Sequence, residues 1–157
     1  MNKTEQLLLQ KINRKKAKIA IVGLGYVGLP LAEAFANFGY EVTGIDIDSK
    51  KIRLIEQGKS FISDVSSSDI NRHVKKGKLH AFADYDPIQH VDVVIICVPT
   101  PLNRAKDPDI SFIVSVTDAI QTRIHEGQLI ILESTTYPGT TEEVILPMLE
   151  EKGLKVG

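Results

Sequence analysis

The sequence is poor in the residues that build disulfide-bonded, metal-bound and membrane-spanning proteins. It has no tryptophan, two methionines and a single cysteine, Cys97, among 157 residues. One cysteine excludes a disulfide within the chain, and no cysteine and histidine grouping has the spacing of a zinc site, so no metal is expected. No apolar run reaches the roughly 18 residues of a membrane span, and the N-terminal segment does not resemble a secretory signal.

Excess charge of either sign is also lacking, because 19 Lys and Arg stand against 20 Asp and Glu, for a formal net charge of -1. Such a chain has no global field that favours nucleic acid or an anionic membrane surface, and we expect neither partner. The basic cluster at 14–16 is interpreted as a solvated face. A single cysteine and no targeting segment suit the reducing cytoplasm, which is the expected location.

The length and the 43% hydrophobic content predict one domain with a sizeable core. Apolar residues at helical spacing in 4–15 predict a helical extension over residues 1–16, followed by the main domain over 17–157.

Apolar segments that alternate with amphipathic ones dominate the main domain. Strands are predicted at 18–23, 41–46, 79–83, 91–98 and 128–134, with another opening at 154–156. Helices are predicted at 28–38, 49–58, 66–77, 110–127 and 140–153. Nearly continuous apolar strands are typical of strands buried on both faces. The alternation predicts an α/β fold, a doubly wound parallel sheet with helices on both faces.

Residues that begin or end helices stand at the borders of these segments. Glycine can adopt the left-handed conformation that closes a helix, as expected for Gly39, Gly58, Gly77, Gly127 and Gly153. Serine can cap a helix start, as expected for Ser49 and Ser66. Thr140 or Thr141 with Glu143 resembles a capping box.

Three glycines, Gly23, Gly25 and Gly28, lie between the first predicted strand and the first helix of the main domain. In a dinucleotide-binding turn the first glycine permits the tight turn, the second lets the backbone approach a diphosphate, and the third lets helix and strand pack closely. Free N–H groups at the helix start would face the phosphates. The pattern alone is weak, because a glycine-rich turn also serves a plain strand-to-helix connection.

Asp46, at the end of the second predicted strand, supports the dinucleotide interpretation. It follows Gly28 by 18 residues, close to the spacing of an acid that binds the adenosine ribose. A carboxylate accepts hydrogen bonds from the 2′-hydroxyl and repels a 2′-phosphate, which predicts NAD rather than NADP in a Rossmann-like fold. The nearby Lys51 and Arg53 leave alternatives open, since a cation there could pair with Asp46, cover the ribose or attract a phosphate.

Five ordered motifs resemble the NAD-binding domain of the nucleotide-sugar 6-dehydrogenases over roughly residues 16–157. They are GLGYVGLP (23–30), GIDID (44–48), CVPTPL (97–102), PDIS (108–111) and ESTTYPGTTEE (133–143). Glu133 before the Ser-Thr pair is similar to the branch that oxidises UDP-N-acetylhexosamines, UDP-N-acetylglucosamine foremost. UDP-N-acetylmannosamine dehydrogenases share this glutamate, whereas UDP-glucose dehydrogenases usually have lysine, and both remain alternatives.

The resemblance implies oxidation of the sugar C6 alcohol to a carboxylate with two NAD⁺ reduced in succession. It places the cysteine of the thioester step, with its lysine and asparagine, in a later domain, so this chain is expected to bind NAD without oxidising the UDP-sugar alone. By this resemblance, the chain is expected to lack the central helix and the substrate domain of the family. A full-length parent is expected to be a homo-oligomer.

The resemblance also implies roles for residues after the fourth and fifth strands. Thr100, with Val98 and Pro99, is expected to contact the nicotinamide side of the cofactor; the alternative is a solvent-facing turn hydroxyl. Ser134 and Thr135 are expected to contact the cofactor, and Thr135 is the candidate catalytic residue that positions a water near C6. Capping of the following helix is the alternative for these hydroxyls.

Other cofactor and loop residues are assigned less specifically. Tyr26 and Val27, inside the glycine motif, are expected at the diphosphate, although Tyr26 could instead pack between domains. Asn103, Arg104 and Lys106 could approach substrate phosphates or belong to a solvated loop.

Several reactive side chains are interpreted as structural. Cys97 lies in an apolar strand with no local base and is expected in the core. Glu133 is expected to be a paired, half-buried carboxylate. The four histidines, His73, His80, His90 and His125, are expected at the surface or as caps.

Two functions of other kinds stay open. A stand-alone NAD-sensing module would share the glycine turn and the acid but would not need CVPTPL or ESTTYPGTT. A hydroxyacid-type dehydrogenase with the same sheet fits these two motifs less well.

Overall fold

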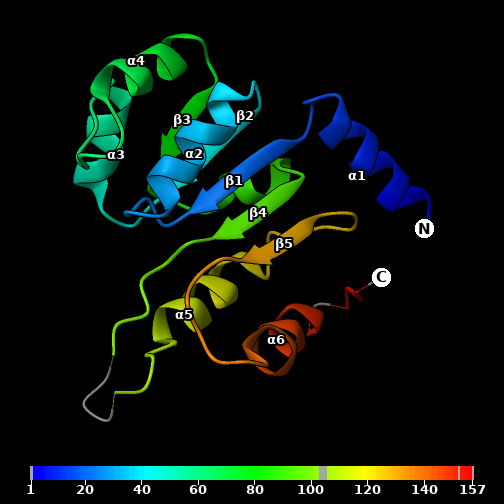
Figure 1. Ribbon diagram of the computed structural model, residues 1–157. Helices are drawn as coiled ribbons and strands as arrows, with labels where there is room; N and C mark the ends of the chain where they lie inside the picture. Colours follow the sequence, from blue (N-terminus) through cyan, green and yellow to red (C-terminus); the bar gives the residue numbers. More distant parts are fainter. Residues whose placement is uncertain (1, 103–105, 152, 157) are drawn as a thin grey trace.

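A computed structural model describes residues 2–102, 106–151 and 153–156. Within them one parallel sheet has the strand order β3-β2-β1-β4-β5 (Figure 1). The strands are β1 (Lys18–Val22), β2 (Glu41–Ile45), β3 (Leu79–Phe82), β4 (Val93–Ile96) and β5 (Leu129–Leu132). The chain builds outward from β1 to β3, crosses back to β4 and continues to β5, so the predicted doubly wound α/β sheet is confirmed.

Helices form in each segment where the sequence predicts one. They are α1 (Lys3–Asn13), α2 (Gly28–Asn37), α3 (Ser49–Glu56), α4 (Ser67–Lys75), α5 (Ser111–Ile120), η2 (Thr141–Ile145) and α6 (Leu146–Glu150). The predicted helix at 110–127 is too long, because α5 gives way to turns after Ile120. The last helix begins as the π-helical turn η2, and an additional 3₁₀ helix, η1 (Asp86–His90), starts with Pro87 in its first turn.

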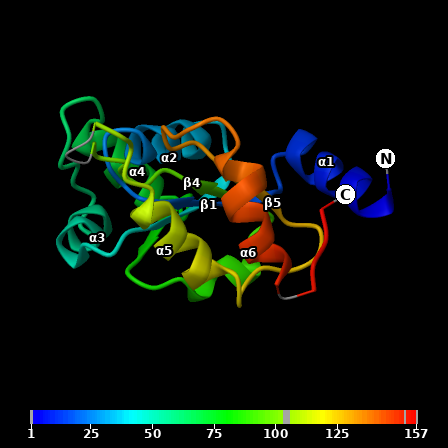
Figure 2. The ribbon, with the colours of Figure 1, turned by 90° about the horizontal axis from the view of Figure 1, so that it is seen from below.

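Helices cover both faces of the sheet (Figure 2). Each face has its own hydrophobic cluster. On one face α2, α3 and α4 pack against residues that include Ile21 and Ile95. On the other face α5 and η1 pack against residues that include Val22 and Ile96. Alternate residues of β1 and β4 therefore enter opposite clusters, which explains their nearly continuous apolar sequences.

The strands were expected to be buried on both faces. The central strands β1 and β4 are buried in this way, whereas the edge strands β3 and β5 are not. β1 and β4 are buried apart from Lys18, but β3 alternates between buried and exposed residues and β5 is only partly buried. Each of these two strands has a neighbour on one side only among the described residues. The strand predicted at 154–156 is wrong, because these residues have no regular secondary structure.

The predicted helix ends are partly confirmed. All five glycines have positive φ, and Gly39, Gly58, Gly77 and Gly153 follow the ends of helices, but Gly127 lies in a turn seven residues beyond α5 and closes no helix. Ser66 caps α4 through Asp69 N–H. The cap of α3 is Asp48, whose side chain accepts from Lys50 N–H, so Ser49 is the first helical residue instead. The capping box at 140–143 is also wrong, because Thr140 donates to the Tyr137 carbonyl and no side chain caps η2.

Helix α1 lies at the amino-terminal edge of the sheet and is held by a few polar contacts. Lys11 Nζ pairs with Asp92, and the Tyr40 hydroxyl donates to the Ile12 carbonyl. None of its described residues is buried. In the described part of the chain, helices fall short of the length and apolar character that crossing a membrane requires.

Replacement of Ile21 by alanine tests the central packing. Ile21 is fully buried in the cluster beneath α2, so the Ile21→Ala change should lower the free energy of unfolding by about 2–5 kcal/mol. The control is Leu7→Ala on the exposed side of α1, expected to change it by less than about 0.5 kcal/mol. Urea denaturation measures both, and equal effects would contradict the assigned core.

Candidate cofactor-binding site

The candidate residues meet at the carboxyl edge of the sheet. The glycine turn, residues 23–28, follows β1, Asp46 follows β2, and loops 97–110 and 133–139 follow β4 and β5 (Figure 1). β1 and β4 are neighbours, although their following connections run to opposite sides of the sheet. Such a switch point opens the crevice in which doubly wound folds bind ligands.

Two glycines of the turn are required by packing. Gly23 has φ +95°, and a Cβ there would lie 2.6 Å from the carbonyl oxygen of Cys97. A Cβ on Gly28 would lie 1.8 Å from the carbonyl oxygen of Gly23. The turn is thus pressed between the end of β4 and the start of α2, and neither position has room for a side chain.

Gly25 differs from these two, because a Cβ there would have no atom within 4 Å. The space in front of it is open, and Tyr26 and Val27 beside it are exposed. Helix α2 has no side-chain cap and no acidic residue in its first turn. Its first N–H groups and its positive dipole end therefore suit an anionic group such as a diphosphate.

Asp46 is buried, with 8% of its surface exposed, and its carboxylate is almost fully engaged. One oxygen accepts from Asp48 N–H at 2.9 Å, and the other accepts from Leu24 N–H at 2.8 Å and Lys51 Nζ at 2.9 Å. Of the open alternatives, Lys51 pairs with Asp46, while Arg53 is exposed. A carboxylate has about four acceptor positions, so one remains for a ribose hydroxyl.

The loop after β4 folds back on itself. Val98 and Thr100 are partly buried and Pro99 is exposed, while Asp109 N–H donates to the Pro101 carbonyl. The backbone N–H of Ser111 donates to the Asp109 carboxylate and lowers the pKa of that group. Of the residues assigned to substrate phosphates, Asn103 and Arg104 lie outside the described residues, and Lys106 is exposed.

The loop after β5 contacts the loop after β4. The Ser134 hydroxyl donates to the Val98 carbonyl at 2.8 Å, and the Tyr137 hydroxyl donates to the Pro108 carbonyl. Thr135 is exposed. Glu133 is exposed too, so its expected half-burial is wrong; it lies beyond the end of an edge strand, where the sheet no longer covers it.

Asp46 and Thr135 are the candidates that lie farthest apart along this edge. Three strand intervals separate β2 from β5, which at about 4.8 Å each amounts to roughly 14 Å. The sheet therefore does not join all the candidates into one compact site. It arranges them in a row, with the glycine turn between the two ends, and a ligand that touches both ends must be extended.

Cys97 is a core residue, as expected. Its side chain packs in the cluster beneath α2, and burial, with a smaller effect of the Glu133 charge, raises the pKa of its thiol to about 11. The thiol stays protonated at neutral pH and is no nucleophile.

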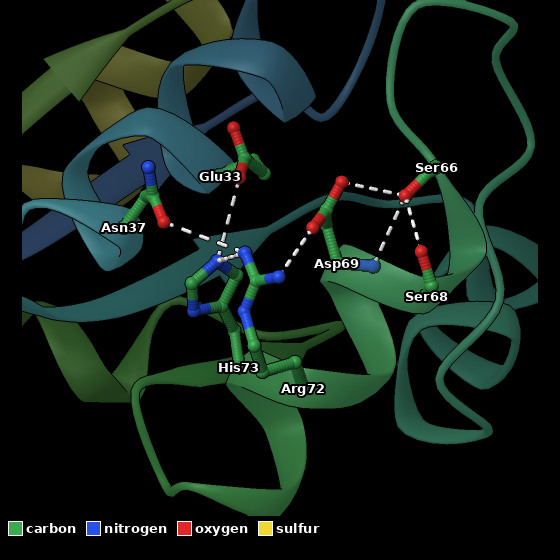
Figure 3. Close-up of polar contacts among 7 residues, drawn as sticks. All are labelled: Glu33, Asn37, Ser66, Ser68, Asp69, Arg72 and His73. Carbon is green, nitrogen blue, oxygen red and sulfur yellow. Dashed lines mark hydrogen bonds and ion pairs between the residues drawn. The ribbon is translucent and has the colours of Figure 1, made fainter.

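His73 is buried between α4 and α2, so its expected surface role is wrong (Figure 3). Its Nε2 lies 3.4 Å from a Glu33 carboxylate oxygen, beside Arg72, which pairs with Asp69. Of the positions at helical spacing from His73, only Ile70 is apolar, so the sequence offered little sign of this burial. Among the described residues, no cluster of three or more His, Cys, Asp or Glu side chains could hold a metal ion.

The roles of Leu24, in the glycine turn, and of Gly44, in β2, were missed from sequence. Leu24 is fully buried, and it lies over Gly44 in β2, where a Cβ would be 2.8 Å from a Leu24 methyl carbon. A single glycine inside an apolar strand is a sign of such a close approach.

Known proteins carry the same arrangement. The model of the UDP-glucose/GDP-mannose dehydrogenase family, NAD binding domain, matches residues 17–156. This chain belongs to that family. It is 36% identical over 135 residues to the UDP-N-acetyl-D-glucosamine 6-dehydrogenase of Salmonella typhi, a match over 85% of this chain and 31% of that protein. It is 38% identical over 144 residues to the UDP-N-acetyl-D-mannosamine dehydrogenase of Pyrococcus horikoshii, over 89% and 34%.

Among solved structures, a ternary complex of GDP-mannose dehydrogenase from Pseudomonas aeruginosa matches the structure of this chain with a TM-score of 0.83 and 36% sequence identity. The match covers 87% of this chain and 33% of that one. The chain therefore spans about a third of the length of the relatives it matches. It is the NAD-binding domain of a nucleotide-sugar dehydrogenase.

The different surroundings of Gly25 and Gly28 predict opposite effects of alanine in this NAD-binding domain. Gly25→Ala should leave the free energy of unfolding within about 0.5 kcal/mol, because its Cβ enters open space. It should weaken NAD⁺ binding about tenfold or more, because the methyl group would occupy the path expected for the diphosphate. Gly28→Ala should destabilise the fold by about 3 kcal/mol or more.

Urea denaturation and calorimetric titration separate these two effects. Unchanged NAD⁺ affinity in Gly25→Ala would contradict the placement of the diphosphate.

The raised pKa of Cys97 predicts slow thiol labelling. Alkylation by iodoacetamide requires the thiolate, whose fraction should rise only as the pH approaches about 11. In the urea-unfolded chain the rise should come near the ordinary value of 9.0. Mass spectrometry of the labelled chain over a pH series measures both, and fast labelling of the folded chain at neutral pH would contradict the buried, protonated state.

Proposed function

We propose that the complete enzyme carrying this domain oxidises the C6 hydroxyl of UDP-N-acetylglucosamine to a carboxylate, and that NAD⁺ lies extended along the carboxyl edge of this sheet. The observation that carries the cofactor placement is the buried Asp46 carboxylate beside the glycine turn and the uncapped start of α2. These groups supply an acceptor for a ribose hydroxyl and donors for a diphosphate.

Each part of NAD⁺ has matching residues along the row. Asp46 accepts from the adenosine ribose, with Lys51 holding the carboxylate from the solvent side. The N–H groups of residues 25–28 and the open space at Gly25 take the diphosphate. Val98, Pro99, Thr100 and Ser134 border the nicotinamide end, and the exposed hydroxyl of Thr135 is free to orient water or the sugar alcohol. Bound NAD⁺ supplies the hydride acceptor for the alcohol carbon.

The surroundings of Asp46 support NAD⁺ over NADP⁺. A 2′-phosphate would approach a buried carboxylate, and the nearest cation, Lys51, already pairs with that carboxylate at 2.9 Å. Little positive charge remains to compensate a phosphate there.

The sugar is the least determined part of the proposal. Glu133 and the segment 133–143, together with the relative from Salmonella typhi, support UDP-N-acetylglucosamine. The 38% identity to the Pyrococcus horikoshii enzyme favours UDP-N-acetylmannosamine as a second candidate. UDP-glucose is a weaker alternative because of Glu133.

This chain is proposed to bind NAD⁺ without oxidising a UDP-sugar by itself. Its single cysteine has a thiol pKa of about 11 and is buried, so it cannot form the covalent intermediate that the second oxidation needs. We place that cysteine in the further domain of the complete enzyme, which we propose to be a cytoplasmic homo-oligomer.

Calorimetric titration with NAD⁺ and NADP⁺ tests the cofactor assignment. The chain should bind NAD⁺ at least about tenfold more tightly than NADP⁺, because of Asp46. Arg53→Met is the control, since Arg53 is exposed and should not change the ratio. Equal or tighter NADP⁺ binding would overturn the assignment.

A second experiment tests whether this chain oxidises a UDP-sugar by itself. The NAD⁺-loaded chain is mixed with UDP-N-acetylglucosamine, UDP-N-acetylmannosamine or UDP-glucose, and NADH formation is followed by absorbance. No signal is expected, and NADH formation would refute the proposal that the chain alone does not oxidise a UDP-sugar. Product analysis with the same three sugars and the complete enzyme then identifies the substrate.

A further inference from the structure

Leu24, between the first two glycines of the turn, is held by β2 in two ways. Its side chain is fully buried, and its N–H donates to a carboxylate oxygen of Asp46 at 2.8 Å. A plain strand-to-helix connection needs neither contact, because Gly23 and Gly28 already satisfy the packing of the turn.

Gly44 makes room for the Leu24 side chain. A Cβ at Gly44 would lie 2.8 and 2.9 Å from the two methyl carbons of Leu24. Gly44 pairs with Ile21 and Ala81 in regular parallel register, and its φ is not positive. Glycine is therefore needed here for space and not for backbone freedom.

Gly44 lies in β2 and Asp46 directly follows it. Because the two residues are two positions apart, both face the same side of the sheet. One receives the Leu24 side chain and the other receives the Leu24 N–H. We propose that Gly44 and Asp46 are positioning residues that clamp Leu24 and so preset the diphosphate-binding turn before the cofactor arrives. This inference rests on the proposed placement of NAD⁺ at the turn.

The clamp gives Asp46 a second task beside the ribose contact. The oxygen that accepts from Leu24 N–H is also held by Lys51, and the other oxygen is held by Asp48 N–H. Because these contacts exist without ligand, the turn needs little further ordering when a diphosphate binds. Loss of the clamp should weaken every ligand that touches the turn, including one without ribose hydroxyls.

Titrations with ADP and 2′,3′-dideoxy-ADP separate the two tasks of Asp46. Alanine at position 46 offers no acceptor to Leu24 N–H. Asp46→Ala should therefore weaken dideoxy-ADP about tenfold and ADP by more. If Asp46 acted through the ribose alone, dideoxy-ADP affinity would not change, and that result overturns the clamp.

Asp48→Ala is the matched control. It removes the cap of α3 while leaving Leu24 N–H and its acceptor in place, so it should lower stability without changing dideoxy-ADP affinity. An equal loss of affinity in this control would assign the effect to general destabilisation and overturn the clamp.

Gly44→Ala tests the other half of the clamp without touching a ligand contact. It should weaken ADP and dideoxy-ADP by the same factor, because the added methyl group displaces Leu24. If this variant does not fold, Leu24→Ala in the same chain should restore folding, because it removes the atoms that the new Cβ meets; failure of this rescue counts against the clamp.

Amide hydrogen exchange at Leu24 gives a readout that does not depend on ligand. The Leu24 N–H should be protected in the ligand-free chain and lose protection in Asp46→Ala, and an unprotected wild-type amide would overturn the clamp. A wild-type chain with a protected Leu24 N–H that binds neither ADP nor NAD⁺ would instead refute the proposed function.

Discussion

The close approach of the glycine turn to the end of β4 is the constraint on which the site depends. Gly23 lies so near the Cys97 carbonyl, and Gly28 so near the Gly23 carbonyl, that no side chain fits at either place. This packing brings the start of α2 to the crevice between β1 and β4. The Cys97 side chain is buried in the hydrophobic cluster beneath α2, and this burial raises the pKa of its thiol to about 11.

The parallel sheet turns this local packing into an extended site. Because all strands run the same way, every loop that follows a strand reaches the same edge. Asp46 and Thr135 are the candidates farthest apart along that edge, and Ser134 and Tyr137 fasten the loop after β5 to the loop after β4. In the proposed placement, the buried Asp46 and the glycine turn hold one end of the dinucleotide, and the exposed Thr135 stands at the other end.

Errors in the sequence-based predictions gather where neighbours decide the outcome. Glu133 was expected to be half-buried because its strand is apolar, but β5 is an edge strand with less cover. The capping box at 140–143 fits the residue pattern, yet Gly139 and the turn before it direct Thr140 back to Tyr137. His73 was expected at the surface or as a cap because it is polar, but the packing of α4 on α2 buries it. Local patterns do not contain these long-range contacts.

The sequence by itself determined the order of strands and helices, the glycine turn and the acid after β2, because periodicity and backbone conformation depend on near neighbours. It also carried the family, through motifs in a fixed order. Only the tertiary structure decided how Asp46 is used and why Gly44 is a glycine. Both depend on Leu24, which lies 22 residues from Asp46 along the chain and touches β2 only after the sheet has formed.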